Sequence, residues 1–262
     1  MNSKSILKNY ENLSWTDIKG IASSSRSTII WTFGAIEQHG PHLPLGTDSI
    51  FVDEIINEVL SLLPDDLPLK KFPTQYIGFS PEHSFFDGTI TISSGLLTNL
   101  IVEIGKQLSD MGFRRLVLLN AHGGQISLLN TAARELRKYA PNLSVFPCFI
   151  WSGVDGLENY LSDSEIENGL HASQAETSLM LSLKPELVGD ERPCEGIPNN
   201  IPKGWSLEGD APVAWFTKDI SNSGVIGDSR GASEAIGANL QKLLVKHWYS
   251  MLLELMSCDW PN

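Results

Sequence analysis

The stretch Arg115-Leu-Val-Leu-Leu-Asn120, followed directly by Ala121-His122-Gly123-Gly124, decides the fold class of this chain. A short apolar run that ends at a polar residue and two glycines is typical of a buried strand. Apolar residues then repeat at helical spacing from about Gln125 to Tyr139. A strand that passes through a tight turn into an amphipathic helix is the repeating unit of α/β proteins.

The same alternation continues on both sides of this unit. The pattern predicts further strands over 27–33, 70–77 and 144–150, and helices over 48–63, 95–111, 172–183 and 232–255. Strands that alternate with helices favour right-handed crossovers and a mainly parallel sheet with helices on both faces. The sequence therefore predicts a three-layer α/β/α fold with its site beyond the C-terminal strand ends.

Composition narrows the class of protein. The chain has 262 residues, 42% of them hydrophobic, and no Ser/Gly/Pro-rich linker divides it, so we expect one domain over 1–262. A net charge of −12 argues against nucleic acid and anionic membrane surfaces as partners. Three cysteines without CxxC spacing favour a reducing compartment, and neither a signal peptide nor a long apolar segment is recognisable. We expect a cytoplasmic protein.

Two segments lack clear periodicity. Residues 151–168 are acidic and read as a loop. Residues 182–231 carry many glycines and prolines and are too long for an ordinary connection. We expect this second segment to form a functional lid or an oligomer contact.

Carboxylates and imidazoles gather at the predicted strand ends. Glu37 and His39 lie two residues apart just after a strand, so an extended backbone points both side chains to one side. His122 follows the strand over 115–120, where a simple turn is its alternative role. Asp48 could be only the N-cap of the next helix, and Glu176 only a first-turn glutamate favoured by the helix dipole. Oxygen and imidazole donors without thiolates favour Zn²⁺ or Mn²⁺ in a hydrolytic site.

A long motif follows the first predicted strand and reads Glu37-Gln-His39-Gly40-Pro-His42-Leu-Pro-Leu-Gly46-Thr47-Asp48. This motif resembles that of the creatininase family of creatinine amidohydrolase-like metal enzymes. The likeness continues through Gly78-Phe-Ser80-Pro-Glu82-His83, Asn120 to Gly124, His171 to Ser178 and Gly224 to Asp228. The resemblance spans about residues 10–250. It implies a creatininase-like α/β/α fold, a dinuclear metal centre and hydrolysis of a non-peptide, often cyclic, C–N amide bond.

The resemblance also implies roles for single residues. Glu37, Asp48 and His122 would bind one metal, and His39, Asp48 and Glu176 the other, with Asp48 as the bridge. The ions would be Zn²⁺ or Mn²⁺, with Fe²⁺ as an alternative, and a hydroxide held between them would attack the amide carbon. His171 is the candidate acid/base, with an ordinary pKa near 6.5. Substrate contacts, or structural support, are expected from Ser80, Glu82, His83, Gly123 and Gly124.

Departures from the family pattern bear on the substrate. Creatininase carries a glutamate ligand where this chain has Gly124, which argues against creatinine and leaves Glu176 to complete the second site. Ser173, Gln174 and Asp87 replace residues that are commoner in the family. Family members with a Gly-Gly pair include enzymes that act on formamides and one that cleaves a precursor peptide.

Three functions remain open at this point. The first is an amidohydrolase with a small-molecule amide as substrate. The alternatives are a peptidase-like enzyme that matures a peptide precursor and a non-catalytic metal-binding scaffold. A homo-oligomer, plausibly the hexamer that the resemblance implies, is expected in each case.

Overall fold

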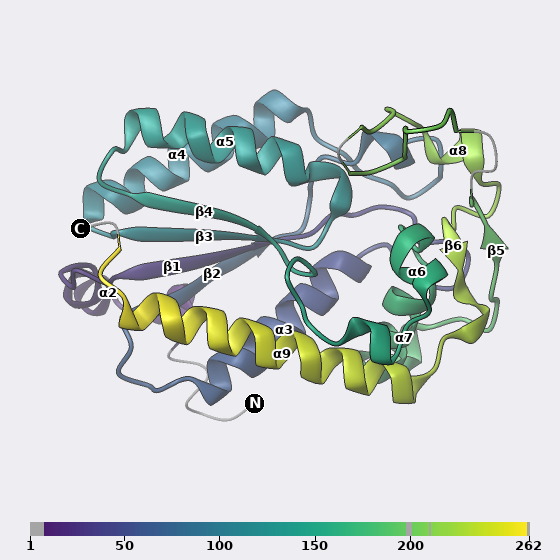
Figure 1. Cartoon of the computed structure of the whole chain (residues 1–262). Coiled ribbons are helices and arrows are strands. Elements are labelled where there is room, and N and C mark those ends of the chain that lie inside the picture. The colour runs from purple at the N-terminus through teal and green to yellow at the C-terminus, as the bar shows by residue number, and fades with distance from the viewer. Residues whose placement is uncertain (1–7, 198–200, 210, 261–262) are drawn as a thin grey trace.

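A parallel four-stranded sheet forms the centre of the molecule. The structure is a computed structural model, and it describes residues 8–197, 201–209 and 211–260. The strands are β1 (Thr28–Phe33), β2 (Leu69–Gln75), β3 (Arg115–Asn120) and β4 (Ser144–Phe149), in the spatial order β2-β1-β3-β4. The last residues of β1, β3 and β4 lie in register. The strand ends therefore meet at one edge, which lies toward the right in Figure 1.

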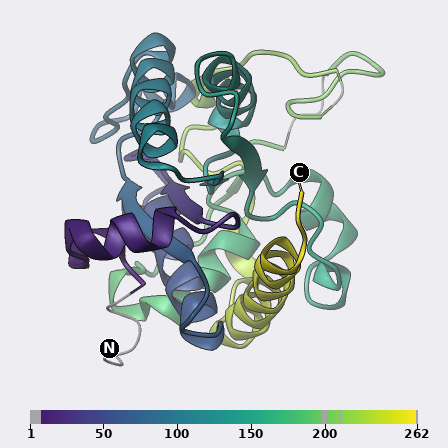
Figure 2. The same ribbon diagram turned by 90° about the vertical axis from the view of Figure 1, so that its left-hand side faces the viewer.

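Helices cover both faces of the sheet, so the predicted three-layer fold is confirmed. Figures 1 and 2 show α4 (Ser94–Met111) and α5 (Ile126–Tyr139) on one face, with α3 (Thr47–Leu62) and α9 (Glu234–Ser257) on the other. A short helix, α2 (Trp15–Ala22), contributes to the first of these layers. Alternate residues of β1 enter different cores: Ile30 packs on the α3/α9 side, and Ile29 on the α4/α5 side.

Close packing at a glycine sets the position of α9 against α7 (Gln174–Leu183). A Cβ on Gly237 would lie 1.8 Å from the carbonyl oxygen of Ser178. Only a residue without a side chain allows the two backbones to approach so closely. This contact anchors α7, whose first turn carries Glu176.

Several predicted boundaries shift, and one prediction is wrong. Helix α7 begins at Gln174 and not near Ala172, because Ala172 has a left-handed φ of 52°. Strand β2 ends at Gln75, short of residue 77. The acidic segment 151–168 is not simply a loop: Ser162 caps a short helix, α6 (Asp163–Asn168), through the backbone N–H of Glu165.

The long segment 182–231 lies at the strand-end side of the molecule (Figure 1). Its described parts include β5 (Cys194–Glu195), α8 (Thr217–Ile220) and β6 (Gly227–Asp228), with β5 and β6 paired antiparallel. Within the described ranges, no helix combines the length and the apolar character needed to cross a membrane.

Candidate metal centre

The chain that leaves β1 carries two of the predicted ligands into the site. Glu37 donates its backbone N–H to the carbonyl of Leu45, and Ile36 and His39 form isolated bridges with Ile90 and Leu43. The backbone is thereby held extended, so the side chains of Glu37 and His39 point the same way. Both are fully buried.

The start of α3 brings Asp48 to the same place. A Cβ on Gly34 would lie 2.2 Å from Ser49 Oγ, so glycine allows the end of β1 to touch the first turn of α3. The helix is capped by Gly46, and Asp48 lies inside its first turn. The interpretation of Asp48 as an N-cap is therefore wrong.

His122 is fixed at the end of β3 by the preceding asparagine. Asn120 accepts the backbone N–H of His122 at 3.0 Å and donates to the His122 carbonyl at 2.6 Å. Gln125 donates to the same asparagine oxygen at 2.9 Å. The turn that follows the strand thus holds His122 against the ligands from β1.

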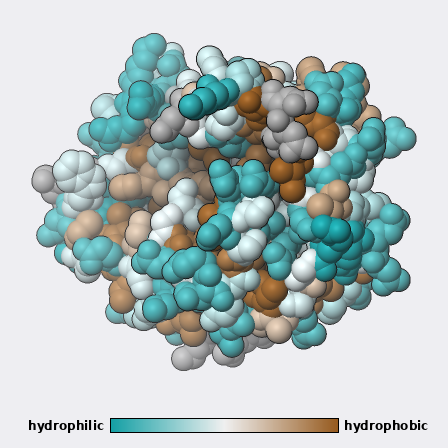
Figure 3. Space-filling view, turned by 45° about the vertical axis from the view of Figure 1, so that its right-hand side comes forward, coloured by the Kyte–Doolittle hydropathy of each residue, from teal (hydrophilic) through white to brown (hydrophobic). Residues whose placement is uncertain are grey.

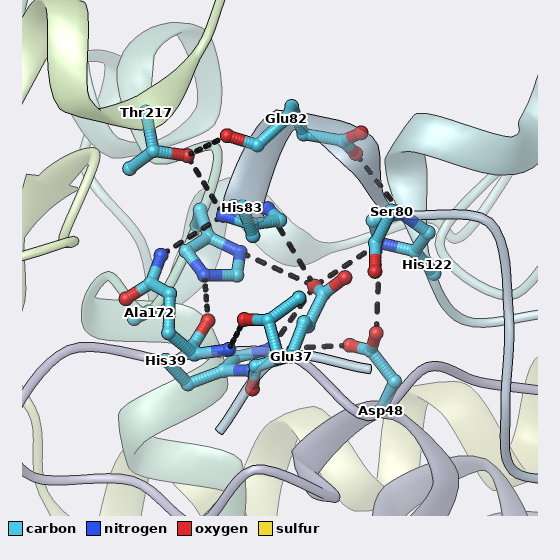
Figure 4. Close-up of polar contacts among 12 residues, drawn as sticks. Glu37, His39, Asp48, Ser80, Glu82, His83, His122, Ala172 and Thr217 are labelled. Carbon is cyan, nitrogen blue, oxygen red and sulfur yellow. Dashed lines mark hydrogen bonds and ion pairs between the residues drawn. The ribbon is translucent and has the colours of Figure 1, made fainter. Parts of the chain in front are cut away.

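The Glu37 carboxylate lies at the centre of the cluster. Its Oε1 is 3.1 Å from His122 Nδ1, 3.7 Å from His83 Nε2 and His171 Nδ1, and 3.8 Å from His39 Nε2. Figure 4 shows these contacts converging on Glu37. Residues that are far apart in the chain therefore meet around one carboxylate.

Asp48 lies between two of the histidines. Its Oδ1 is 3.3 Å from His39 Nε2, and its Oδ2 is 3.6 Å from His122 Nδ1. Glu176 Oε2 is 4.0 Å from His39 Nε2 and also accepts the backbone N–H of Ala172 at 2.7 Å. The structure thus brings all five predicted ligands together, and Glu176 additionally supports the start of α7.

Unpaired buried atoms make this cluster unusual. Within the described part of the chain, both Glu37 carboxylate oxygens, His39 Nε2, Asp48 Oδ2 and His122 Nε2 have no partner in hydrogen-bond geometry, although Glu37 Oε1 and His122 Nε2 make ion-pair contacts at 3.1 and 3.0 Å. Buried polar atoms are almost always paired, because leaving them unpaired is costly. His39 Nδ1 faces the Glu37 carbonyl at 3.2 Å, an arrangement that leaves Nε2 free as a ligand atom. Carboxylates and imidazoles with these free atoms fit divalent metal ions.

The buried carboxylates of the cluster favour positive charge on the groups beside them. Burial opposes a charged His39, but Asp48, Glu176 and Glu37 outweigh it and raise its pKa to about 9. Burial likewise opposes a charged His122, yet Glu37 and Glu82 raise its pKa well above 6.5. Burial raises the pKa of Glu37, and that of Glu176 to about 7. A site in which carboxylates pull protons onto histidines would also hold metal cations.

His171 and His83 lie beside the predicted ligands. Their rings stack with centroids 4.1 Å apart, and burial lowers the pKa of both well below 6.5. The pKa of His171 thus lies below its ordinary value, so the ring is neutral near pH 7, as a proton acceptor requires. His171 also lies close enough to His39 and Glu176 to share a metal with them. His42, by contrast, contacts Thr177 Oγ1 at 2.8 Å and lies outside the cluster.

Glu82 fills the space beside Gly124. Its Oε1 is 3.0 Å from His122 Nε2, and a Cβ on Gly124 would lie 1.8 Å from that oxygen. A side chain at position 124 would thus require the Glu82 carboxylate to move. Gly123 has open space around it, and Ser80 is fully buried with an unpaired Oγ among the described residues.

A cavity of about 370 Å³ opens beside the cluster. Its wall combines Glu37, Asp48, His122 and Glu176 with a largely apolar lining that includes Ile126, Phe149, Trp151, Leu157, Leu161, Ile166, Leu170 and Trp215. Figure 3 shows hydrophobic side chains around a hollow in this part of the surface. Trp215, Glu208 and Gly209 come from the long irregular segment, which therefore forms part of the cavity wall.

Sequence reasoning missed some residues around the site. Gln38 and Thr217 both contact His83, and neither was among the predicted site residues. Gln38 stands between two predicted ligands in the motif, and that position is a usable signal. Thr217 lies in a segment without periodicity, and nothing in its sequence context points to the site.

Comparison of the sequence with known proteins identifies a matching family and several relatives. The family described as creatinine amidohydrolase matches residues 11–252. A mycofactocin precursor peptide peptidase of Mycobacterium tuberculosis is 32% identical over 85% of this chain and 83% of its own length. A creatinine amidohydrolase of Pseudomonas putida is 26% identical over 72% of this chain and 77% of its own.

Solved structures show the same fold. A manganese form of creatininase superposes with a TM-score of 0.75 at 22% identity, covering 97% of this chain and 99% of that one. A creatininase variant of the zinc–zinc type gives 0.76 at 23%, covering 97% and 98%. The match to the family over nearly the whole sequence carries the conclusion: the chain belongs to the creatininase family of amidohydrolases.

Proposed function

We propose that this protein is a metal-dependent amidohydrolase that hydrolyses the C–N bond of a small amide carrying an apolar group. The observation that carries the proposal is the convergence of Glu37, His39, Asp48, His122 and Glu176 beside a cavity, the first four of them with buried atoms that lack a hydrogen-bond partner among the described residues. The apolar remainder of that wall suits the non-reacting part of a substrate.

Two divalent cations, Zn²⁺ or Mn²⁺ or one of each, are the proposed cofactors. Glu37, Asp48 and His122 would hold one and His39, Asp48 and Glu176 the other. The existence of manganese and zinc–zinc forms of creatininase supports this choice. Such ions, when bound, lower the pKa of water and polarise an amide carbonyl.

The chain's own residues supply proton transfer and shape. His171 is neutral and presents Nδ1 3.7 Å from Glu37, so we assign it as the group that takes a proton from water and returns it to the leaving nitrogen. The apolar wall excludes water from the substrate side, which strengthens the electrostatic interactions within the site. Gly123 leaves open space where a substrate can approach the backbone.

Creatinine is not the substrate that this cavity favours. The Glu82 carboxylate occupies the space that a side chain at position 124 would need. Position 124 itself therefore has no room for a creatininase-type glutamate while the Glu82 carboxylate lies there, and the lining is largely apolar, whereas creatinine is small and polar.

A second candidate is cleavage of a short precursor peptide. The 32% identity with the mycofactocin precursor peptide peptidase favours it, as does a cavity large enough for one or two apolar side chains. A non-catalytic scaffold is the third alternative, and turnover distinguishes it from both.

One panel of substrates separates these candidates. Purified protein loaded with Zn²⁺ or Mn²⁺ is assayed on creatinine, formamides, lactams and short peptides that end in aliphatic or aromatic residues. Turnover of formamides or lactams supports the main proposal, turnover confined to peptides supports the second, and no turnover across the panel favours a scaffold. Efficient hydrolysis of creatinine would contradict the argument from Gly124.

We further propose a cytoplasmic homo-oligomer, with the hexamer as its form. Exposed hydrophobic side chains include Phe85 and Ile90, which are 54% and 55% accessible in the single chain. Exposed apolar surface of this kind is common at protein–protein contacts.

A further inference from the structure

We propose that Gln38 is a positioning residue that sets the hydrogens of two stacked histidines, so that His83 presents an N–H, and His171 a lone pair, to the cavity. The catalytic roles that we assign to these two histidines rest on the proposed amidohydrolase activity. The arrangement itself follows from hydrogen bonding alone and is tested without turnover.

The orientation of the Gln38 amide is fixed from two sides. The backbone N–H of Gly40 donates to Gln38 Oε1 at 2.8 Å, and Gln38 Nε2 donates to the carbonyl of Gly224 at 3.0 Å. A carbonyl only accepts and a backbone N–H only donates, so the amide cannot be turned around. The second hydrogen on Nε2 is then directed at His83 Nδ1, 2.9 Å away.

His83 therefore carries its proton on Nε2. An amide nitrogen has no lone pair to offer, so Nδ1 of His83 must be the acceptor. The Thr217 hydroxyl lies 2.7 Å from the same atom and 3.1 Å from the carbonyl of Glu82, and its single hydrogen can go to only one of the two. Nε2 lies on the opposite side of the ring, 3.7 Å from Glu37 Oε1, and its N–H faces the site. An atom that carries a hydrogen is not a metal ligand, so His83 is a donor at the cavity wall and not a ligand.

The neighbouring ring has the reverse arrangement. His171 Nε2 lies 2.6 Å from the backbone carbonyl of Gln38, which only accepts, so this nitrogen carries the hydrogen. Nδ1 is left with its lone pair, 3.7 Å from the same Glu37 oxygen. One residue thus directs both rings, through its side chain for His83 and through its backbone for His171.

Gly224 makes room for this amide. Its φ is 88°, and a Cβ there would lie 1.9 Å from Gln38 Oε1. The glycine therefore serves the position of Gln38 as well as the local turn. This assigns a role to the Gly224–Gly227 segment, which the metal ligands leave unexplained.

The pairing gives the cavity complementary groups. An N–H on His83 can donate to the oxygen of a substrate carbonyl as negative charge develops on it. A lone pair on His171 can accept a proton from water. Each function requires the hydrogen position that Gln38 imposes.

Histidine NMR tests the assignment directly. The zinc-loaded protein, which is diamagnetic, is labelled with ¹⁵N-histidine, and long-range ¹H–¹⁵N correlations report which ring nitrogen carries hydrogen. His83→Gln and His171→Gln assign the signals. We expect both rings to be protonated on Nε2, with Nδ1 of His83 shifted as a hydrogen-bond acceptor. A hydrogen on His83 Nδ1 in the unmodified protein overturns the proposal.

Gln38→Glu supplies the sharpest variant. A carboxylate accepts where the amide donated, so His83 should gain a hydrogen on Nδ1, whereas His171 should stay unchanged because its partner is a backbone carbonyl. Gln107→Glu makes the same chemical change on the exposed surface of α4, where Gln107 donates to the carbonyl of Glu103. It should leave both rings unchanged. A His83 signal that is the same in both variants overturns the proposal.

Two further measurements keep the test decisive. If Gln38→Glu does not fold, Gln38→Met removes the donor with little change in volume and should weaken the acceptor shift at His83 Nδ1. An unaltered shift counts against the proposal. On any substrate that is turned over, Gln38→Glu should reduce kcat about 10²-fold with unchanged metal content. The expected NMR pattern without turnover on any substrate would refute the proposed function and leave this inference standing.

Discussion

The two ends of the parallel sheet bury charged side chains in opposite ways. At the N-terminal end, Arg115 is 1% accessible and donates to the carbonyls of Leu255, Cys258 and Trp260. Lys8 nearby donates to the carbonyls of Leu60 and Leu63, each at 2.6 Å. These cations close the end of a helix or hold the C-terminal residues.

At the C-terminal end, several carboxylate and imidazole atoms of the described residues lack such partners. Glu37 is as deeply buried as Arg115, yet neither of its carboxylate oxygens is hydrogen-bonded within the described residues. Burial of charge alone therefore does not identify a site. The distinguishing feature is buried charge whose atoms converge without being paired, and each test below bears on that distinction.

The largest effect is expected from Asp48→Asn. The amide is neutral and weakens both metal positions, because Asp48 lies between His39 and His122. We expect loss of both metals and a fall in turnover of about 10³-fold or more. Metal analysis of protein purified without chelator, close to two ions per chain before the change, checks this. Full activity in the variant would reduce Asp48 to a residue of the first helical turn.

Glu176→Ala is expected to remove the second metal and abolish turnover. If Glu176 only supports the helix start, the variant should instead lose about 0.3–1 kcal/mol of stability and keep its metals. Metal content, melting temperature and turnover are measured on one sample. Retention of two metals with normal turnover would contradict the ligand assignment.

A substitution at the N-terminal end of the sheet serves as the comparison for these changes in the metal ligands. Arg115→Met leaves three carbonyls without their donor, and we expect it to lower the free energy of unfolding by about 2–4 kcal/mol. Metal content should not change, since the residue lies at the other end of β3. Urea denaturation with metal analysis checks both points. Loss of metal from a folded variant would contradict the conclusion that Arg115 serves stability and that metal binding belongs to the other end of the sheet.

Acid is expected to weaken the second metal position. Burial raises the pKa of Glu176 to about 7, so the carboxyl binds a proton below that pH, and the proton competes with the metal. Affinity should fall by up to about tenfold per pH unit below 7 and level off above it. Chelator competition at pH 6 and pH 8 measures this. In Glu176→Gln, the part of the pH dependence of metal affinity that comes from this carboxyl group should disappear.

The smallest effect concerns assembly. Phe85→Ser and Ile90→Ser alter exposed side chains, so they should shift the oligomer toward smaller species with little change in metal content. Light scattering at micromolar concentrations reports the mass. A monomeric unmodified protein would contradict the proposed oligomer.

The strands and part of the candidate site could be predicted because they depend on short, local patterns in the sequence. The strands were recognisable because each is a short, buried run, and Glu37, His39 and Asp48 because they share one motif at a strand end. The start of α7 was misplaced because a left-handed Ala172 is unusual for a residue with a side chain.

The surroundings of the histidines could not be predicted in this way. Gln38 and Thr217 reach His83 from positions 45 residues before it and 134 residues after it. The contact depends on packing between loops, which leaves no periodic trace in the sequence. The altered pKa of His171 has the same origin, since burial between other rings causes it.

The contact between Gly124 and Glu82 has an evolutionary consequence. Because a Cβ at position 124 would overlap the Glu82 carboxylate, substitutions at these two positions are epistatic. A lineage that acquires a side chain at 124 first passes through a crowded intermediate, in which His122, 2.7 Å from that Cβ, is disturbed too. A lineage that first shortens or reorients residue 82 does not. The order of the two mutations therefore determines which intermediates remain functional when substrate preference changes.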